Sequence, residues 1–327
     1  MVRAAESSME RSTAGPGNHP GLSLLAPLCL SACQEEAGSW RWARSDPEAR
    51  VGYHQRMGPK SECRVVSSEA RRRVAFPLER RLVLDTLRLG HRQPMMHGLL
   101  EVDVTRARTL LRELRQRSGE GLSFTAFVLA CLGRAVAAHP EVHALRDWLG
   151  RSVLFEDVDV TTMIEVDVEG RPFALAHVIR AVNRRSPREI HDEIRSIQHG
   201  GPDWMAPGMR AAFKLVLRMP GVLRRLVLRG LLRFPRLAKR HVGTVLLTAV
   251  GMFGGGPGWG WSAPGIHGLS IVVGGIAMRA GAGTDPPVAR EVLCLTVSAD
   301  HNRVDGAPMS RFVRDLRTRL EAADGLC

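Results

Sequence analysis

The 327-residue chain is poor in the residues on which several classes of protein depend. It has one tyrosine, Tyr53, so it is badly supplied with the aromatic platforms that stack single-stranded nucleic acid. Its six cysteines form no CxxC pair and have no histidine at metal-ligand spacing. No apolar run reaches 18 residues. We therefore expect no nucleic-acid partner, no metal centre and no membrane-spanning helix.

Negative charge is also scarce. The net charge is +13 and the isoelectric point is about 10.8. Between residues 204 and 284 there is no acidic residue. A basic surface attracts anions, which leaves nucleic acid, an anionic membrane or a phosphate-rich cofactor as candidates, and composition alone does not choose among them. The cysteines have the pattern of reduced, cytoplasmic thiols, with Cys131 and Cys294 expected as small buried hydrophobes.

The first 75 residues differ from the rest of the chain. They are rich in Gly, Ser, Pro and isolated charges without periodicity, so we expect residues 1–75 to be a largely disordered extension and residues 76–327 to form the folded domain. The segment 30–33, Leu-Ser-Ala-Cys, resembles a lipoprotein cleavage box. Pro20 and Pro27 interrupt the preceding apolar run, so we favour a cytoplasmic location over export.

Hydrophobic periodicity predicts alternating strands and helices in the second part. Helices are expected at residues 105–117, from Phe124 past Val136 with Ser123 as the cap, at 186–197, and after Pro308. Strands are expected at residues 99–104, twice within 153–168, and at 173–179, 244–250, 269–278 and 292–298. The sum is an α/β (α+β, two-layer) fold, in which a mixed sheet has helices on one side.

The chemistry-bearing segment runs from Ser298 to Gly306, between a buried strand and an amphipathic helix. His301 leaves the strand end, where a side chain faces a cleft while its backbone stays fixed. A neutral imidazole, with a pKa near ~6.5, accepts the proton of a thiol whose pKa is about 8.5. His301 is therefore the candidate general base, a role that contributes about 10²–10⁴ in rate.

The pattern His301-x-x-x-Asp305-Gly306 resembles the signature of the 2-oxoacid dehydrogenase acyltransferases and of chloramphenicol acetyltransferase. Residues 243–254, GTVLLTAVGMFG, resemble that family's GTFTISNLGMFG in the same order before the histidine. Upstream segments resemble its first core strand, its long helix and the strand-strand-helix that follows, so the resemblance covers roughly residues 80 to 325. It implies a chloramphenicol acetyltransferase-like fold, assembled as a homotrimer.

The resemblance also implies roles for single residues. His301 is implied to deprotonate coenzyme A, Asp305 to orient the motif loop, and the hydroxyl of Thr248 to donate a hydrogen bond to the tetrahedral oxyanion. In the family the active site lies between subunits. The acyl donor would be acyl-coenzyme A, and the acceptor a lipoyl group on another protein or a small thiol, amine or alcohol. His91, His97, His177 and His267 are assigned no function.

The sequence departs from the family pattern at two places. Asn302 stands where the family has arginine, with Arg303 one place later, and Ala249-Val250 replaces Asn-Leu beside the oxyanion position. No lysine lies in the Asp-Lys-Ala context of a lipoyl domain. We therefore expect a stand-alone enzyme without a bound lipoyl group.

Residues 209–241 alternate apolar residues with arginine and lysine. We favour an arginine-faced helix that covers the core, over a basic amphipathic helix pair, broken at Pro220-Gly221, on an anionic membrane. Attraction of the coenzyme A phosphates is an intermediate option. Two alternatives to the soluble enzyme stay open: a non-catalytic trimeric scaffold, and a membrane-associated lipid acyltransferase or condensing enzyme.

Overall fold

The computed structural model describes residues 78–168, 171–199, 215–251, 256–281 and 288–326. The predicted extension 1–75 lies outside the described residues. All of the described residues fall within one unit, residues 72–327.

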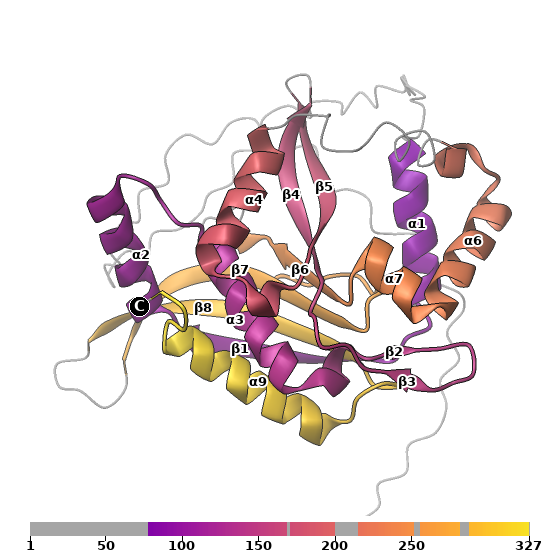
Figure 1. Ribbon diagram of the computed structural model, residues 1–327. Helices are drawn as coiled ribbons and strands as arrows, with labels where there is room; N and C mark the ends of the chain where they lie inside the picture. The colour runs from indigo at the N-terminus through magenta and orange to yellow at the C-terminus, as the bar shows by residue number, and fades with distance from the viewer. Residues whose placement is uncertain (1–77, 169–170, 200–214, 252–255, 282–287, 327) are drawn as a thin grey trace, which may run out of the picture. The chain divides into compact units, whose positions relative to one another are not determined.

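Six strands form one mixed sheet in the order β1-β8-β7-β6-β4-β5 (Figure 1). They are β1 (Met95–Asp103), β4 (Val160–Val168), β5 (Arg171–Ile179), β6 (Val245–Ala249), β7 (Leu269–Ala280) and β8 (Ala289–Asp300). Strand β6 runs parallel to both neighbours, β4 and β7, and the other pairs are antiparallel. A separate hairpin joins β2 (Leu145–Arg146) to β3 (Ser152–Val153).

Helices cover one face of the sheet (Figure 1). They are α2 (Thr105–Ser118), α3 (Phe124–Ala138), α4 (Pro187–His199) and α9 (Gly306–Glu321). Helix α3 is the central one, because its residues from Ala126 to Gly133 are all buried. Phe127 of α3 and Phe312 of α9 are fully buried in the shared core. The predicted two-layer fold, a mixed sheet with helices on one side, is confirmed.

Alternation along the strands decides which side chains meet these helices. Val245 and Leu247 of β6 are fully buried and belong to the core cluster, whereas Leu246 and Thr248 point to the opposite face. The same opposite face of β7 and β8 carries hydroxyl groups, at Ser270, Thr296 and Ser298. One face is thus the hydrophobic core and the other offers polar side chains.

Several local predictions are confirmed at the residue level. Ser186 and Glu189 form the reciprocal hydrogen bonds of a capping box at the start of α4. Ser123 precedes α3 as expected, but its hydroxyl makes no capping bond. The last helix was predicted after Pro308 but begins earlier, at Gly306, because proline fits the first helical turn. Both predicted buried cysteines, Cys131 and Cys294, are buried.

The arginine-rich segment forms two described helices, α6 (Gly221–Arg233) and α7 (Pro235–Val242). The predicted break at Pro220 is confirmed, and a second break at Phe234 precedes Pro235. Helix α6 packs on α1 (Leu78–Gly90). The two helices are joined by Asp85 of α1, which is 1% exposed and pairs with Arg224 and Arg225 of α6. Part of the basic charge is therefore buried and joins two helices, whereas the favoured interpretation expected the charges of this segment to be solvated. Among the described helices, none has the length and hydropathy to cross a membrane.

Candidate active site

The turn that carries His301 is fixed at its backbone and open at its side chain. Strand β8 ends at Asp300, and the His301 N–H donates a 2.8 Å hydrogen bond to the carbonyl oxygen of Pro94, just before β1. The imidazole is 54% exposed. Its Nδ1 lies 3.7 Å from Oδ1 of Asp305, in ion-pair range but beyond a hydrogen bond. The two motif residues therefore face each other on the surface of one protomer.

The same turn is anchored from below by Asp300, which is 3% exposed. Its Oδ1 accepts the N–H of Asn302 at 3.0 Å, and its Oδ2 accepts Nε of Arg303 at 3.1 Å. Arg303 also donates to the carbonyl oxygen of Ala144 at 3.3 Å. Burial lowers the pKa of the Arg303 guanidinium, and the charge of Asp300 opposes that shift. The guanidinium displaced by one place thus holds the turn, a role that the sequence analysis did not assign.

Thr248, the predicted oxyanion donor, lies near the end of β6 on the face away from the helices. It is half-buried, and its hydroxyl has no hydrogen-bond partner among the described residues. The strand end is tightly packed, because a Cβ at Gly251 would lie 1.8 Å from the carbonyl oxygen of Gly274. The hydroxyl is therefore free to bind a ligand, close to a tightly packed strand end.

The sheet register keeps Thr248 and His301 of one chain apart. Thr248 is level with Val272 on β7 and, through it, with Thr296 on β8. Two strand spacings, about 10 Å, and the four residues from Thr296 to Asp300, about 13 Å, separate the hydroxyl from the histidine turn. The predicted catalytic residues are thus divided into His301 with Asp305, which come together, and Thr248, which does not join them within a chain.

A second histidine lies on the same face. Nδ1 of His97 is 2.8 Å from Oγ of Ser298, and the centre of its ring lies 4.0 Å from that of Trp261, with the two planes tilted by 42°. Oγ of Ser262 lies 3.4 Å from Oγ of Ser270 on the neighbouring strand. Burial lowers the pKa of His97, which favours the neutral imidazole. Nothing in the sequence pointed to a function for His97, because its hydroxyl partner is brought to it only by the pairing of β1 with β8.

Comparisons with known proteins agree with this geometry. The family model described as 2-oxoacid dehydrogenases acyltransferase (catalytic domain) matches residues 239–327, from α7 through the histidine turn to the end of α9. No curated protein matches the sequence significantly.

Solved structures of acyltransferase cores share the fold across most of the chain. A probable dihydrolipoamide acetyltransferase from Listeria monocytogenes is 16% identical, with a TM-score of 0.57, over 78% of this chain and 97% of that one. The dihydrolipoamide acetyltransferase of Azotobacter vinelandii is 15% identical, with a TM-score of 0.58, over 83% and 99%. A truncated 2-oxoacid dehydrogenase catalytic core from Thermoplasma acidophilum is 20% identical, with a TM-score of 0.55, over 78% and 100%.

The sheet order, the one-sided helices and the exposed histidine turn define the fold of an acyltransferase catalytic domain. Its C-terminal part, residues 239–327, carries the sequence pattern of the 2-oxoacid dehydrogenase acyltransferases, so the resemblance read from the sequence is confirmed.

Proposed function

We propose that this protein is a coenzyme A-dependent acyltransferase that moves an acyl group between coenzyme A and a thiol acceptor of the lipoyl type. The observation that carries the proposal is the histidine turn, in which an exposed imidazole faces Asp305 on a backbone fixed by Asp300 and Pro94. The family match over residues 239–327 supports it, because that segment contains the whole turn.

The proposed mechanism uses one proton and one thioester. Because Nδ1 of His301 faces Asp305, Nε2 is the nitrogen that takes the proton of the attacking thiol. The thiolate adds to the thioester carbonyl, and the hydroxyl of Thr248 donates a hydrogen bond to the negative oxygen. When the intermediate collapses, the original C–S bond breaks and the leaving thiolate recovers the proton from His301.

The proposal requires two copies of the chain at each site. In one protomer, Thr248 and His301 lie too far apart along and across the sheet to act on the same carbonyl group. We infer that one protomer supplies His301 and its neighbour supplies Thr248, in a homotrimer. A closed ring of three heterologous contacts gives three such sites.

Residue spacing in a related enzyme supports the same assignment. A serine, a histidine and an asparagine are named for the catalytic mechanism of the Azotobacter vinelandii enzyme, with the histidine and asparagine four positions apart. Asp305 likewise follows His301 by four positions. That serine precedes the histidine by 52 positions, against 53 from Thr248 to His301. The fourth position thus carries a carboxylate here in place of an amide.

The acceptor is proposed from the family alone. We infer that a lipoyl group arrives on another protein in trans, in the cytoplasm, and that this chain carries none itself. Ala249 and Asn302, the two departures, lie beside the proposed oxyanion donor and the base, so they bear on the choice of acyl group and acceptor.

Two single variants test the roles of the proposed residues. His301→Ala is expected to lower kcat by about 10²–10⁴, and Thr248→Val by about 10²–10³, because each removes one transition-state interaction. The measurement is formation of acyl-dihydrolipoamide from acyl-coenzyme A, followed by mass spectrometry. Thr248→Ser, which keeps the hydroxyl, is the matched control. Full activity of His301→Ala would refute the mechanism.

Mixing the two inactive variants tests whether the site is shared. In trimers assembled at random from equal amounts of the variants, about a quarter of the sites pair an intact His301 with an intact Thr248. Co-expression should therefore restore about a quarter of the wild-type activity. If turnover stays at the level of the single variants, both groups act within one chain or neither acts. Normal trimers without wild-type turnover would favour a non-catalytic scaffold.

A membrane-associated transferase is the second candidate, and one observation favours it. Helix α6 exposes large apolar side chains beside its arginines, at Val222, Leu223, Leu226 and Val227. Such a surface suits an anionic bilayer. Sedimentation with anionic vesicles tests it, and Leu223→Ser with Leu226→Ser should abolish binding. Arg224 and Arg225 are unsuitable probes, because they pair with the buried Asp85.

A further inference from the structure

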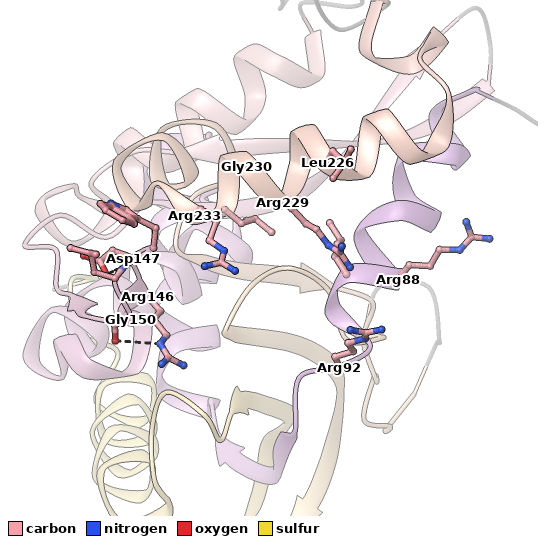
Figure 2. Close-up of a pocket in the computed structure, with 13 residues that line it drawn as sticks. Arg88, Arg92, Arg146, Asp147, Gly150, Leu226, Arg229, Gly230 and Arg233 are labelled. Carbon is pink, nitrogen blue, oxygen red and sulfur yellow. Dashed lines mark hydrogen bonds between the residues drawn. The ribbon is translucent and has the colours of Figure 1, made fainter.

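A cavity of about 980 Å³ lies among the end of α1, the β2–β3 hairpin and α6 (Figure 2). Helix α6 forms one wall with Leu226, Arg229, Gly230 and Arg233, which lie on one face at helical spacing. Helix α6 lies outside the segment that the family model matches. The cavity is therefore a feature that the family assignment does not explain.

The lining of the cavity is strongly positive. Five arginines contribute to it: Arg88, Arg92, Arg146, Arg229 and Arg233. In Figure 2, Arg229 and Arg233 extend from α6, and Arg92 and Arg146 lie across the gap from them. Arginine presents paired N–H donors that match phosphate oxygens, so this group of five is suited to a phosphorylated ligand.

Nearby carboxylates pair with one of these five arginines, Arg88, whose Nη1 lies 3.9 Å from Oδ1 of Asp85. Asp147, the one acidic residue in the lining, bonds to Nε of Arg151 at 2.8 Å. It also accepts the N–H groups of Leu149 and Arg151. Among the described residues, Arg92, Arg229 and Arg233 form no ion pair. The cavity therefore holds several guanidinium groups without a counter-charge, and an anion would supply it.

The remaining wall is apolar. Trp148 and Leu149, at the tip of the hairpin, are 61% and 53% exposed. An exposed indole beside arginines offers a stacking surface for a nucleobase. The combination favours a ligand that carries both a base and phosphates over an inorganic anion.

Two segments that contribute arginines to the cavity also contact the histidine turn through their backbones. Arg92 lies two residues before Pro94, whose carbonyl accepts the His301 N–H. Arg146 lies two residues after Ala144, whose carbonyl accepts Arg303. A ligand with its phosphates at the arginines can thus extend toward His301.

We propose that this arginine cavity binds clustered phosphate groups, and that in this protein they are the phosphates at the nucleotide end of coenzyme A. In coenzyme A the pantetheine arm lies between the phosphates and the thiol. The phosphates would therefore occupy the cavity while the thiol reaches His301. The identification of the ligand rests on the proposed acyltransferase function. The phosphate chemistry rests only on the cavity.

Gly230 offers a pair of substitutions, to Glu and to Gln, that differ from each other in charge alone. A Cβ at Gly230 meets no atom within 4 Å, so a longer side chain enters open space. Gly230→Glu places a carboxylate beside Arg233, one turn along the helix, where it competes with phosphate. Gly230→Gln has the same size without the charge and is the matched control. Arg233→Gln is the second variant, with Arg314→Gln on the exposed face of α9 as its control.

The experiment is isothermal titration of the full chain with coenzyme A, dephospho-coenzyme A and pantetheine. Gly230→Glu and Arg233→Gln should each raise the Kd of coenzyme A at least about tenfold, because each removes or occupies a charged hydrogen-bond donor. Both controls should stay within about twofold of wild type, and pantetheine should bind all variants equally. Dephospho-coenzyme A should lose less than coenzyme A, since it lacks one phosphate.

Each outcome separates this proposal from the mechanism. If the Kd of coenzyme A is unchanged in both variants, the cavity does not bind its phosphates. If coenzyme A fails to bind but vesicles with phosphorylated inositol lipids bind and Gly230→Glu abolishes this, the identification of coenzyme A is overturned. His301→Ala should keep the wild-type Kd. Tight binding that depends on the arginines, without turnover of any acyl-coenzyme A, would confirm the cavity and refute the transferase.

Discussion

Two buried carboxylates hold arginines in different parts of this chain. Asp300 bonds within its own turn, to the N–H of Asn302 and to Arg303 three residues later. Asp85 bonds across 139 residues, from α1 to Arg224 on α6. The first contact is local and sets the direction of one histidine. The second joins two helices that are far apart in the sequence.

The difference follows from what each arginine leaves exposed. At the turn, Arg303 is 21% exposed and donates to the Asp300 carboxylate and to the carbonyl oxygen of Ala144, so the exposed group is the imidazole of His301. On α6, Arg224 is 5% exposed and faces Asp85, while Arg229 and Arg233 lie on another face toward the cavity. One region thus presents a base and the other presents positive charge.

The largest effects are expected when the carboxylate of Asp85 or of Asp300 is replaced by an amide. Asp85→Asn leaves the Arg224 guanidinium buried without a counter-charge, so we expect a loss of about 3–5 kcal/mol in the free energy of unfolding. Asp300→Asn should cost less, because Arg303 is more exposed. At a temperature where both variants are folded, Asp300→Asn should lower kcat, whereas Asp85→Asn should raise the KM for coenzyme A. Urea unfolding and steady-state kinetics measure these effects.

The contrast would fail if the kinetic effects were reversed. An Asp85→Asn variant with a normal KM and a reduced kcat would mean that α1 and α6 support the histidine turn rather than the cavity. Arg225→Gln is the milder control on the α6 side, since Arg225 is 31% exposed and its partner Asp85 retains Arg224.

Acid should destabilise the protein through a buried histidine, His143. His143 is 1% exposed, and its Nδ1 lies 2.9 Å from the hydroxyl of Thr244 at the start of β6. Burial lowers the pKa of His143 to about 4, from 6.5. Stability from the neutral ring is therefore complete above about pH 6.5 and is lost as the pH falls toward 4, by roughly 3 kcal/mol.

Unfolding by urea at a series of pH values checks this expectation. His143→Asn should be less stable at neutral pH but should lose less stability between pH 6.5 and 4. An unchanged pH profile in the variant would assign the acid sensitivity to other groups.

The smallest expected effect concerns Gly230 on α6, beside the arginine cavity. Gly230→Ala should stabilise the protein by about 0.5–1 kcal/mol, because alanine favours the helix and its Cβ meets open space. Coenzyme A affinity should be unchanged, since the methyl group carries no charge. A thermal unfolding curve and one titration measure both quantities. Destabilisation would mean that Gly230 is needed for close packing.

Much of the fold was predictable because the strands and helices are locally consistent. The period of apolar residues placed α2, α3 and the central strands, and Ser186 with Glu189 marked the start of α4. The histidine turn was also predictable, since Asp305 and Gly306 follow His301 in one continuous segment. Local sequence thus predicts what local contacts stabilise.

The remaining features depend on contacts between distant segments. The second hydrogen bond of Arg303 requires the distant Ala144 to lie beside the turn, and the hydroxyl partner of His97 requires β1 to pair with β8. The cavity gathers arginines from α1, the hairpin and α6, and no single stretch of sequence contains its pattern. The charge of residues 209–241 was visible, but its division between ion pairs and cavity was not.

The register that separates Thr248 from the histidine turn has a practical consequence for enzymology. If neither residue set is complete in a lone chain, specific activity must fall when the protein is diluted until protomers dissociate. Rates measured at low enzyme concentration would then report assembly as much as chemistry, and a plot of rate against enzyme would curve upward.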